Sequence, residues 1–279
     1  MPGGRENDAA APVGVIPRRN LTIQDVQRRR MRNRRVRAAT GLFRSKRLFS
    51  WFLNRALVRA CPEQHGFFVP TAWAQACLKD RLLTEVPTWE IRQVMFDWLH
   101  VGDHRLHISD YFIGGGDWSV FLRSIEKSAI VHEAVQLIEK DMAWGETQAY
   151  RAMIQAIERG APLQRQQVPL DSEEAIARYF DRFTNLIESI RTQGMLRSHE
   201  VDRRVGGQAE REIGIALNRD GALVKLPGGQ HRVAIARAIG LPRIPVEVRL
   251  IHAGLISERY REKGRRPLDA VLDLVAGVG

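Results

Sequence analysis

The sequence predicts an α+β protein, with a mainly helical N-terminal region followed by a small α/β domain. Three observations support this prediction. Residues 70–160 contain segments with a roughly 3.6-residue apolar period, which is typical of helices that bury one face. Residues 165–253 run in the order helix, strand, hairpin, glycine turn, helix and strand. Arg18–Arg47 holds twelve basic residues and one acid, with little apolar surface to bury.

These observations divide the chain into four regions. Residues 1–47 are predicted to form a basic, disordered arm, 48–164 a helical domain, 165–253 the α/β domain and 254–279 a C-terminal helix or tail. Residues 1–60 hold 15 Lys and Arg against three acids, whereas the remaining residues hold 28 against 29. The net charge of +11 therefore lies in the N-terminal region, and it does not make the whole protein a nucleic-acid binder.

The helical region begins with LFSWFLNRALVRA, residues 48–60, which predicts an amphipathic helix. The segments TAWAQACLKDRLL and TWEIRQVMFDWLH predict two further helices. The segment SVFLRSIEKSAIVHEAVQLIEKDMAW predicts a long helix, and ETQAYRAMIQAIERG a last one that ends at Gly160. The apolar face of the first helix consists of Phe49, Phe52, Leu53, Ala56, Leu57 and Ala60.

The α/β region begins with the strand-like VPLD, followed by a helix from Ser172 to Gln193 that Gly194 ends. IGIALNR and ALVKL flank a tight turn and predict a hairpin. GGQHRVAIARAIG predicts a glycine turn that opens a helix, which Gly240 closes. The segment IPVEVRLI alternates between apolar and polar residues, which predicts a strand.

Several classes of protein are excluded on composition. The two cysteines, Cys61 and Cys77, form no paired framework or metal-binding spacing and are expected to be reduced packing residues. We expect no signal peptide and no membrane-spanning helix, because no apolar segment of the required length occurs. The default compartment is the cytoplasm.

The turn Gly228–Arg232 is the segment whose residues suggest a ligand-binding site. Glycines let a ligand approach the backbone closely, and the N–H groups that begin a helix favour an anion. His231 and Arg232 add side-chain donors, so the turn could hold a phosphate. It is not a Walker A loop. The residues alone leave open whether it is a phosphate site or an ordinary turn with a solvated arginine.

The segment GGQHRVAIARAIGLPRIPVEV resembles the signature of the ParB/sulfiredoxin superfamily: a Gly-x-[His/Arg]-Arg turn, an Ala-bearing helix, a Gly and an Ile-Pro-Val strand. The helix FTNLIESIRTQGML is similar to the second motif of that family. VPLD at 168–171 and SHEV at 198–201 fall where the family begins and where its first strand lies. The resemblance covers the C-terminal third of the chain and implies a nucleotide-binding domain.

The activities of that superfamily differ, and the residues discriminate among them. Sulfiredoxins carry a nucleophilic Cys where this chain has Gln230, and a carboxamide cannot form the sulfur intermediates. Partition proteins carry a helix-turn-helix module, for which the roughly 25 residues after Ile251 are too few. We therefore expect an ATP-dependent phosphotransferase, with ATP or CTP and Mg²⁺, acting on an unidentified small or lipid-linked acceptor.

In this interpretation the resemblance implies a set of site residues. His231 and Arg232 would stabilise transferred charge, and Glu200 would be the catalytic base, with Asp202 and Asp220 as alternatives. No metal-ligating residues are assigned: the cluster HVGDHRLH is expected to be a polar loop, and Gly114–Asp117 a turn. The nucleotide-binding residues would be Lys225, Gly228, Gly229, Gln230, His231 and Arg232.

The basic residues 18–60 leave three alternatives open. They could bind nucleic acid through its phosphates, they could bind an anionic membrane surface together with Phe43, Phe49, Trp51 and Phe52, or they could simply be solvated. The alternative function of the chain is therefore a nucleotide-gated nucleic-acid-binding protein. A membrane contact would make the cytoplasmic protein peripheral at the membrane.

Overall fold

The computed structural model describes residues 13–17, 20–59, 64–165, 168–194, 204–205, 208–209, 212–263 and 266–278. Helices and strands are mixed along the chain, so the α+β class is confirmed. The helices are α1 (Ile23–Ala39), α2 (Lys46–Arg59), α3 (Thr71–Leu78), α4 (Ala129–Glu139), α5 (Gln148–Glu158), α6 (Glu173–Gln193), α7 (Gln230–Ala238), α8 (Ala253–Lys263) and α9 (Pro267–Ala276).

The strands are short except for β15, which forms the centre of the largest sheet. They are β1 (Val13–Val15), β2 (Gly66–Pro70), β3 (Leu83–Pro87), β4 (Gln93–Met95), β5 (Trp98–Val101), β6 (His104–His107), β7 (Tyr111–Gly115), β8 (Leu122–Ser124), β9 (Leu163–Arg165), β10 (Val168–Leu170), β11 (Arg204–Val205), β12 (Gln208–Ala209), β13 (Ile213–Leu217), β14 (Leu223–Lys225) and β15 (Arg243–His252).

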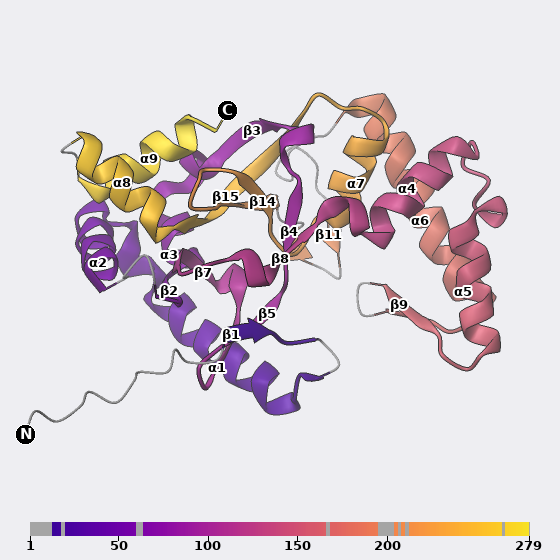
Figure 1. The fold of residues 1–279 in the computed structure, drawn as a ribbon, viewed down its shortest axis with the longest axis horizontal. Helices are drawn as coiled ribbons and strands as arrows, with labels where there is room; N and C mark the ends of the chain where they lie inside the picture. Colours follow the sequence, from indigo (N-terminus) through magenta and orange to yellow (C-terminus); the bar gives the residue numbers. More distant parts are fainter. Residues whose placement is uncertain are drawn as a thin grey trace, which may run out of the picture.

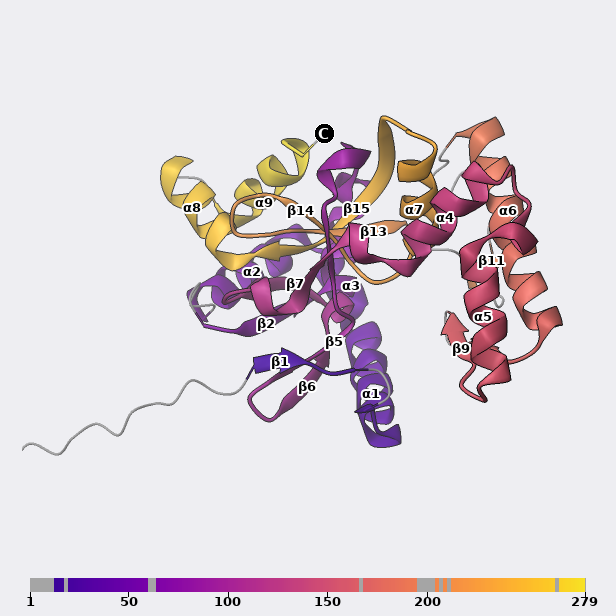
Figure 2. The ribbon, with the colours of Figure 1, turned by 45° about the vertical axis from the view of Figure 1, so that its right-hand side comes forward.

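The central sheet runs in the order β2-β7-β15-β13-β14-β4-β8, and β3 pairs with β15 as an eighth strand. β13, β15 and β7 are parallel to one another, whereas β14 and β4 run the opposite way. α4, α5, α6 and α7 gather at one end of this sheet, and α2, α8 and α9 gather at the other (Figure 1). The same two groups of helices stay apart in the turned view (Figure 2).

One hydrophobic core joins the two groups of helices through the sheet. It includes Leu53 of α2, Phe112 of β7, Phe183 of α6 and Val271 of α9, all at most 2% exposed. A second cluster around Leu99 packs β5 and β6 against the other strands. The structure therefore does not separate residues 48–164 from 165–253, because one sheet and one core contain residues of both regions.

Several predicted elements are confirmed. α6 begins after Ser172, whose side chain accepts a hydrogen bond from the Ala175 N–H, and it ends at Gly194. α5 is followed by Gly160 in a left-handed conformation. The β13–β14 hairpin, α7 and β15 lie where the sequence predicts them. α2 buries Phe49, as predicted for its apolar face, and residues 254–279 contain α8 and α9.

The prediction that residues 70–160 are helical is wrong for two segments. TWEIRQVMFDWLH forms a 3₁₀ turn followed by β4 and the beginning of β5, and SVFLRSIEK forms β8 with flanking turns before α4 begins at Ala129. β4 lies between β14 and β8 in the central sheet, and β5 lies between β1 and β6 in a separate three-stranded sheet. Each buries two successive apolar residues, so these residues do not alternate as those of a half-exposed strand do. A short apolar run of this kind is compatible with either a helix or a strand.

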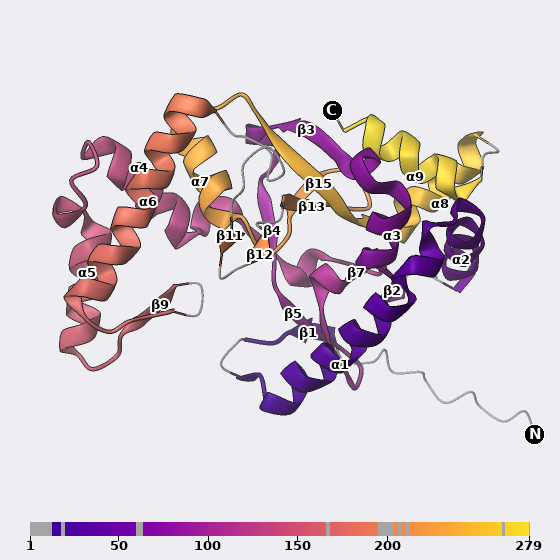
Figure 3. The same cartoon turned by 180° about the vertical axis from the view of Figure 1, so that it is seen from behind.

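The prediction of a disordered arm over 1–47 is also wrong for the part that the structure describes, because α1 is a helix with a capping box. The Thr22 hydroxyl accepts from the Asp25 N–H at 3.2 Å, and Asp25 accepts from the Thr22 N–H at 2.9 Å. α1 contacts α3 and β6, and Figure 3 shows α1 and α3 from behind. Trp73 of α3 donates to the Val36 carbonyl at 3.1 Å.

α1 has no apolar face, so ion pairs hold it in place. Arg29 donates two hydrogen bonds of 2.8 Å to the Asp110 carboxylate, and Arg32 pairs with the same carboxylate. Arg32 also donates to the Tyr111 hydroxyl at 2.6 Å. Burial acts to raise the pKa of Asp110, but hydrogen bonds and charge from Arg29, with further charges nearby, outweigh burial and lower it. One carboxylate therefore anchors a strongly basic helix.

Most of the aromatic residues that could have contacted a membrane surface are packed in the interior of the protein. Phe43 and Phe49 are buried, and the ring of Phe52 packs edge-on against Trp73. Trp51 is the exposed member of the set, at 58%. Among the described residues, no helix combines the length and the apolar composition needed to cross a membrane.

We predict that Asp110→Asn will loosen α1 at neutral pH, because the amide cannot pair with two guanidinium groups. Loss of these charged hydrogen bonds should cost about 1.5–3 kcal/mol of unfolding free energy. Hydrogen exchange over Ile23–Ala39 should quicken. Because the pKa of Asp110 is lowered on folding, its contribution should be present above about pH 4 and fall away as the wild type is acidified.

The control for this experiment is Asp103→Asn, in the exposed turn between β5 and β6. It should leave both the exchange of α1 and the unfolding free energy close to those of the wild type. Unchanged exchange of α1 in Asp110→Asn would show that other contacts hold the helix.

Candidate functional site

The glycine turn connects β14 to α7 and requires both of its glycines. Gly228 has φ +97° and Gly229 has φ +64°, a conformation that other residues rarely adopt. Gly229 is the N-cap of α7 and has no side chain with which to bond the first N–H groups of the helix. A Cβ on Gly228 would meet nothing within 4 Å, so the space beside this residue is open. The N–H groups that begin α7 therefore lie next to open space.

Three cationic side chains are buried beneath this turn. Lys225, Arg232 and Arg249 are 1, 2 and 6% exposed. The Lys225 ammonium donates to the carbonyl groups of Leu226 and Gly228, so it fixes the path of the turn. Burial, together with the charges of Arg249 and Arg232, lowers the pKa of Lys225 to about 7. This concentration of positive charge favours an anion at the turn.

Arg249 is held in place from two strands. Its Nε donates to Glu247 Oε2 at 2.5 Å, and its Nη2 donates to the Glu212 carbonyl at 2.9 Å. Gln75 of α3 donates to the other oxygen of Glu247 at 2.7 Å. A Cβ on Gly214 would lie 3.1 Å from Arg249 Cδ, tighter than most contacts, so a glycine lets the arginine lie across β13. The buried charge of Arg249 is thus paired and oriented.

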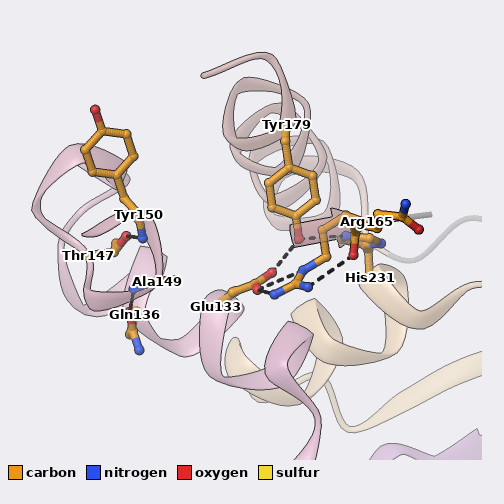
Figure 4. Close-up of polar contacts among 9 residues, drawn as sticks. Glu133, Gln136, Thr147, Ala149, Tyr150, Arg165, Tyr179 and His231 are labelled. Carbon is orange, nitrogen blue, oxygen red and sulfur yellow. Dashed lines mark hydrogen bonds and ion pairs between the residues drawn. The ribbon is translucent and has the colours of Figure 1, made fainter. Parts of the chain in front are cut away.

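His231 belongs to a chain of interacting side chains from four elements (Figure 4). Its Nε2 lies 3.2 Å from the Tyr179 hydroxyl of α6, and that hydroxyl contacts Glu133 of α4. Arg165 of β9 donates to Glu133 from Nε at 3.1 Å and from Nη2 at 2.5 Å. Phe183 packs edge-on against the imidazole, with ring centroids 4.7 Å apart. His231 thereby ties the first turn of α7 to α4 and α6.

This environment sets the charge of His231. Burial, with the positive charge of Arg165, lowers the pKa of His231 to about 4, so the imidazole is neutral at pH 7. Burial and the neighbouring Glu133 raise the pKa of Tyr179, which therefore keeps its hydrogen. A neutral His231 can orient the turn through hydrogen bonds but adds no positive charge to an anion site. Arg232, Arg249 and the protonated form of Lys225 are the cations beneath the turn.

The structure brings most of the predicted nucleotide-binding residues together, since Lys225 and Gly228–Arg232 form one turn and its support. The predicted base Glu200 and its alternative Asp202 lie outside the described residues. Asp220 lies in the β13–β14 turn, at the opposite end of β14 from Gly228. Asp220 is therefore poorly placed to serve the glycine turn.

The other sequence signals belong to the scaffold. His100 and His104 lie on the paired strands β5 and β6, and no group of three metal-ligating side chains occurs among the described residues. Gly114–Asp117 ends β7 and forms a turn, in which Gly116 has φ +82°. Trp118 is buried, and Trp144 stacks on Phe180. Cys77 is buried and reduced, as expected, and Cys61 lies outside the described residues.

Another cavity, of about 800 Å³, lies at the carboxyl ends of β7, β13 and β15. His65, Asp117, Arg219 and His252 line it. His252 accepts from the Gly254 N–H through Nδ1 at 3.0 Å and contacts the Gly116 carbonyl through Nε2 at 2.9 Å. Both ring nitrogens are therefore used in holding backbone, and this cavity lies at the edge of the sheet opposite the glycine turn.

Sequence reasoning missed the partners of His231. Glu133 lies on the same helical face as Ile130 and Leu137, and a carboxylate among apolar residues signals a buried polar contact. Tyr179 and Arg165 carry no comparable local signal, because their contacts with Glu133 span 46 and 32 residues of sequence.

No family model, no curated protein and no solved structure matches this chain. The resemblance to the ParB/sulfiredoxin superfamily accordingly stays a prediction that rests on the motifs of the C-terminal third.

We predict that His231→Gln will be less sensitive to acid than the wild type. The pKa of His231 is about 4 in the folded chain and 6.5 in the unfolded chain. Between these two pH values the unfolded chain therefore binds more protons than the folded chain. The wild type should therefore lose roughly 2 kcal/mol through this group between pH 7 and pH 4.5. Urea unfolding of both proteins at the two pH values measures the difference.

His104→Gln, on the exposed side of β6, is the matched control and should keep the acid sensitivity of the wild type. Equal acid sensitivity in all three proteins would mean that His231 is not buried as a neutral group.

Proposed function

We propose that this protein binds the phosphates of a nucleoside triphosphate at the turn Gly228–Arg232 and transfers a phosphoryl group to an acceptor. The observation that carries the proposal is the set of three buried cations, Lys225, Arg232 and Arg249, beneath a glycine turn that opens a helix. Glu247 pairs with Arg249 at 2.5 Å. A bound phosphate would place further negative charge beside these buried cations, which low-dielectric surroundings make favourable.

The phosphate oxygens would meet the first N–H groups of α7, next to the open space at Gly228. Arg232 would contribute charge from below the turn, and Lys225 would hold the turn in shape through its two carbonyl contacts. ATP or CTP would bring Mg²⁺ with it, bound mainly by the phosphates. His231 is best described as a positioning residue, because its neutral ring bonds Tyr179.

Transfer needs a group that accepts the proton of the attacking hydroxyl. Glu200 remains the proposed base, because the family resemblance assigns an acid to the strand on which it would lie. The acceptor is unidentified, either small or lipid-linked. We place the reaction in the cytoplasm, where triphosphates and Mg²⁺ are available.

A second candidate function has its own supporting observation. Residues 26–59 carry twelve basic residues and no acid, and Arg28, Arg34 and Arg35 are exposed on α1. An ordered helix with exposed arginines could neutralise successive phosphates of a nucleic acid. A nucleotide-gated nucleic-acid-binding protein is therefore the alternative. Burial of Phe43 and Phe49 leaves less apolar surface for a peripheral contact with an anionic membrane.

We predict that Gly228→Ala will weaken triphosphate binding at least tenfold, because the new Cβ occupies the open space beside the turn and strains its backbone. Calorimetry with ATP, CTP and GTP in the presence of Mg²⁺ measures the affinity. Gly240→Ala is the matched control, since Gly240 ends the same helix with φ +72° and equally open surroundings. It should cost similar stability but leave binding within about twofold.

If no triphosphate binds the wild type, the proposed function is wrong. An equal loss of triphosphate affinity in Gly228→Ala and Gly240→Ala would show that strain on α7 causes the loss. That result would also contradict the proposal.

We further predict that Glu200→Gln will bind the triphosphate normally but will transfer its phosphoryl group at least a hundredfold more slowly, because the amide cannot act as a base. Turnover is followed as release of the nucleoside diphosphate during an acceptor screen. Asp220→Asn, at the far end of β14, is the control and should keep its turnover. Full turnover in Glu200→Gln would exclude Glu200 as the base.

A further inference from the structure

A second cation-lined cavity, of about 340 Å³, lies between α1, the beginning of α3 and the residues that precede β7. Arg29, Arg30 and Arg37 reach it from α1, and Arg249 reaches it from β15. The one carboxylate among its lining residues is Asp110, which pairs with Arg29. Arg249 is paired with Glu247 and Arg29 with Asp110, so Arg30 and Arg37 give this small cavity a surplus of two positive charges.

Two hydroxyl groups in this cavity are buried and have no hydrogen-bond partner among the described residues. They are Thr71 Oγ1 and Ser109 Oγ. Thr71 is 5% exposed and is the first residue of α3, and its neighbour Pro70 does not cap the helix. A buried hydroxyl without a partner costs free energy, so native proteins rarely keep one unless something bonds it. The two hydroxyls therefore indicate an oxygen-bearing ligand.

The beginning of α3 adds backbone donors to the same cavity. Thr71 and Ala72, which both line it, belong to the first turn of α3, where N–H groups have no partner within the helix. The partial positive charge of a helix N-terminus favours an anion. Within the described part of the chain, the guanidinium groups of Arg30 and Arg37 form no ion pair, so both can turn toward a ligand.

We propose that this cavity binds the phosphate group of a small phosphomonoester. Such a group has two negative charges near neutral pH and three terminal oxygens, which can meet the Thr71 hydroxyl, the α3 N–H groups and a guanidinium group at once. A phosphodiester within a nucleic acid has two terminal oxygens and continues on both sides. A pocket with buried hydroxyls and a volume of about 340 Å³ fits the end of a small molecule better.

The cavity lies at the same edge of the sheet as the glycine turn. Arg249 lines the cavity, and its guanidinium reaches the Glu212 carbonyl at the beginning of β13. The Leu226 N–H, at the start of the glycine turn, bonds the Gly214 carbonyl of that strand. The phosphomonoester could therefore be the acceptor of the transferred group. This last identification rests on the proposed function, whereas binding in the cavity does not.

The test is calorimetry on the full chain with inorganic phosphate and phosphoserine as probes. Thr71→Val, which keeps the shape of the side chain and removes the hydroxyl, should weaken both probes about tenfold. Without ligand its melting temperature should equal or exceed that of the wild type, because an unpartnered hydroxyl has been removed. Arg30→Glu should abolish binding through reversal of charge, whereas Arg34→Glu, exposed on α1 but outside the cavity, should change it less than about twofold.

Three results would overturn the proposal: no binding of either probe, equal losses in Arg30→Glu and Arg34→Glu, or binding of a single-stranded oligonucleotide alone. Gly228→Ala distinguishes the two sites. Retained phosphate binding in Gly228→Ala supports the cavity, and its loss there would mean that phosphate binds the glycine turn instead. Phosphate binding that depends on Thr71, in a protein that binds no triphosphate, would refute the proposed function and uphold the cavity.

Discussion

The buried ion pair between Arg249 and Glu247 on β15 is the interaction on which both candidate sites depend. Arg249 lies across Gly214 and bonds the backbone at the start of β13, while Glu247 accepts from Gln75 of α3. The same guanidinium lowers the pKa of Lys225 beneath the glycine turn and lines the cavity below α1. Loss of either partner would leave an unpaired buried charge, which typically costs about 3–5 kcal/mol. Charge and backbone position at this edge of the sheet are therefore set together.

How far the sequence predicts the fold depends on whether the signals are local. α6 has a capping serine and a final glycine, and the β13–β14 hairpin has its turn residues, so both follow from short segments. β4 has no such signal, because it pairs with β14 and β8, and its side chains are mostly buried. The same non-local pairing joins the two predicted domains into one sheet, which no local pattern could reveal.

The candidate site likewise has features that local sequence predicts and features that depend on distant residues. The turn Gly228–Arg232 is predictable, because glycines with positive φ followed by a helix carry their own signal. The neutral state of His231 is not, since it depends on Tyr179, Glu133 and Arg165 from three other elements. A histidine beside an arginine in sequence suggests two charges, whereas burial lowers the pKa of one of them well below neutrality.

The basic N-terminal region shows what composition alone leaves undecided. A run of arginines repels itself, and the sequence favours disorder unless carboxylates compensate. Here Asp110 compensates Arg29 and Arg32, and α1 is ordered although its remaining arginines form no ion pair with the residues that the structure describes. An anion in the cavity beside Thr71 would act on Arg30 as Asp110 acts on Arg29, because it would reduce the repulsion along the helix. Ligand binding and the docking of α1 are then thermodynamically linked, since a ligand that binds the folded chain alone stabilises the arrangement it binds.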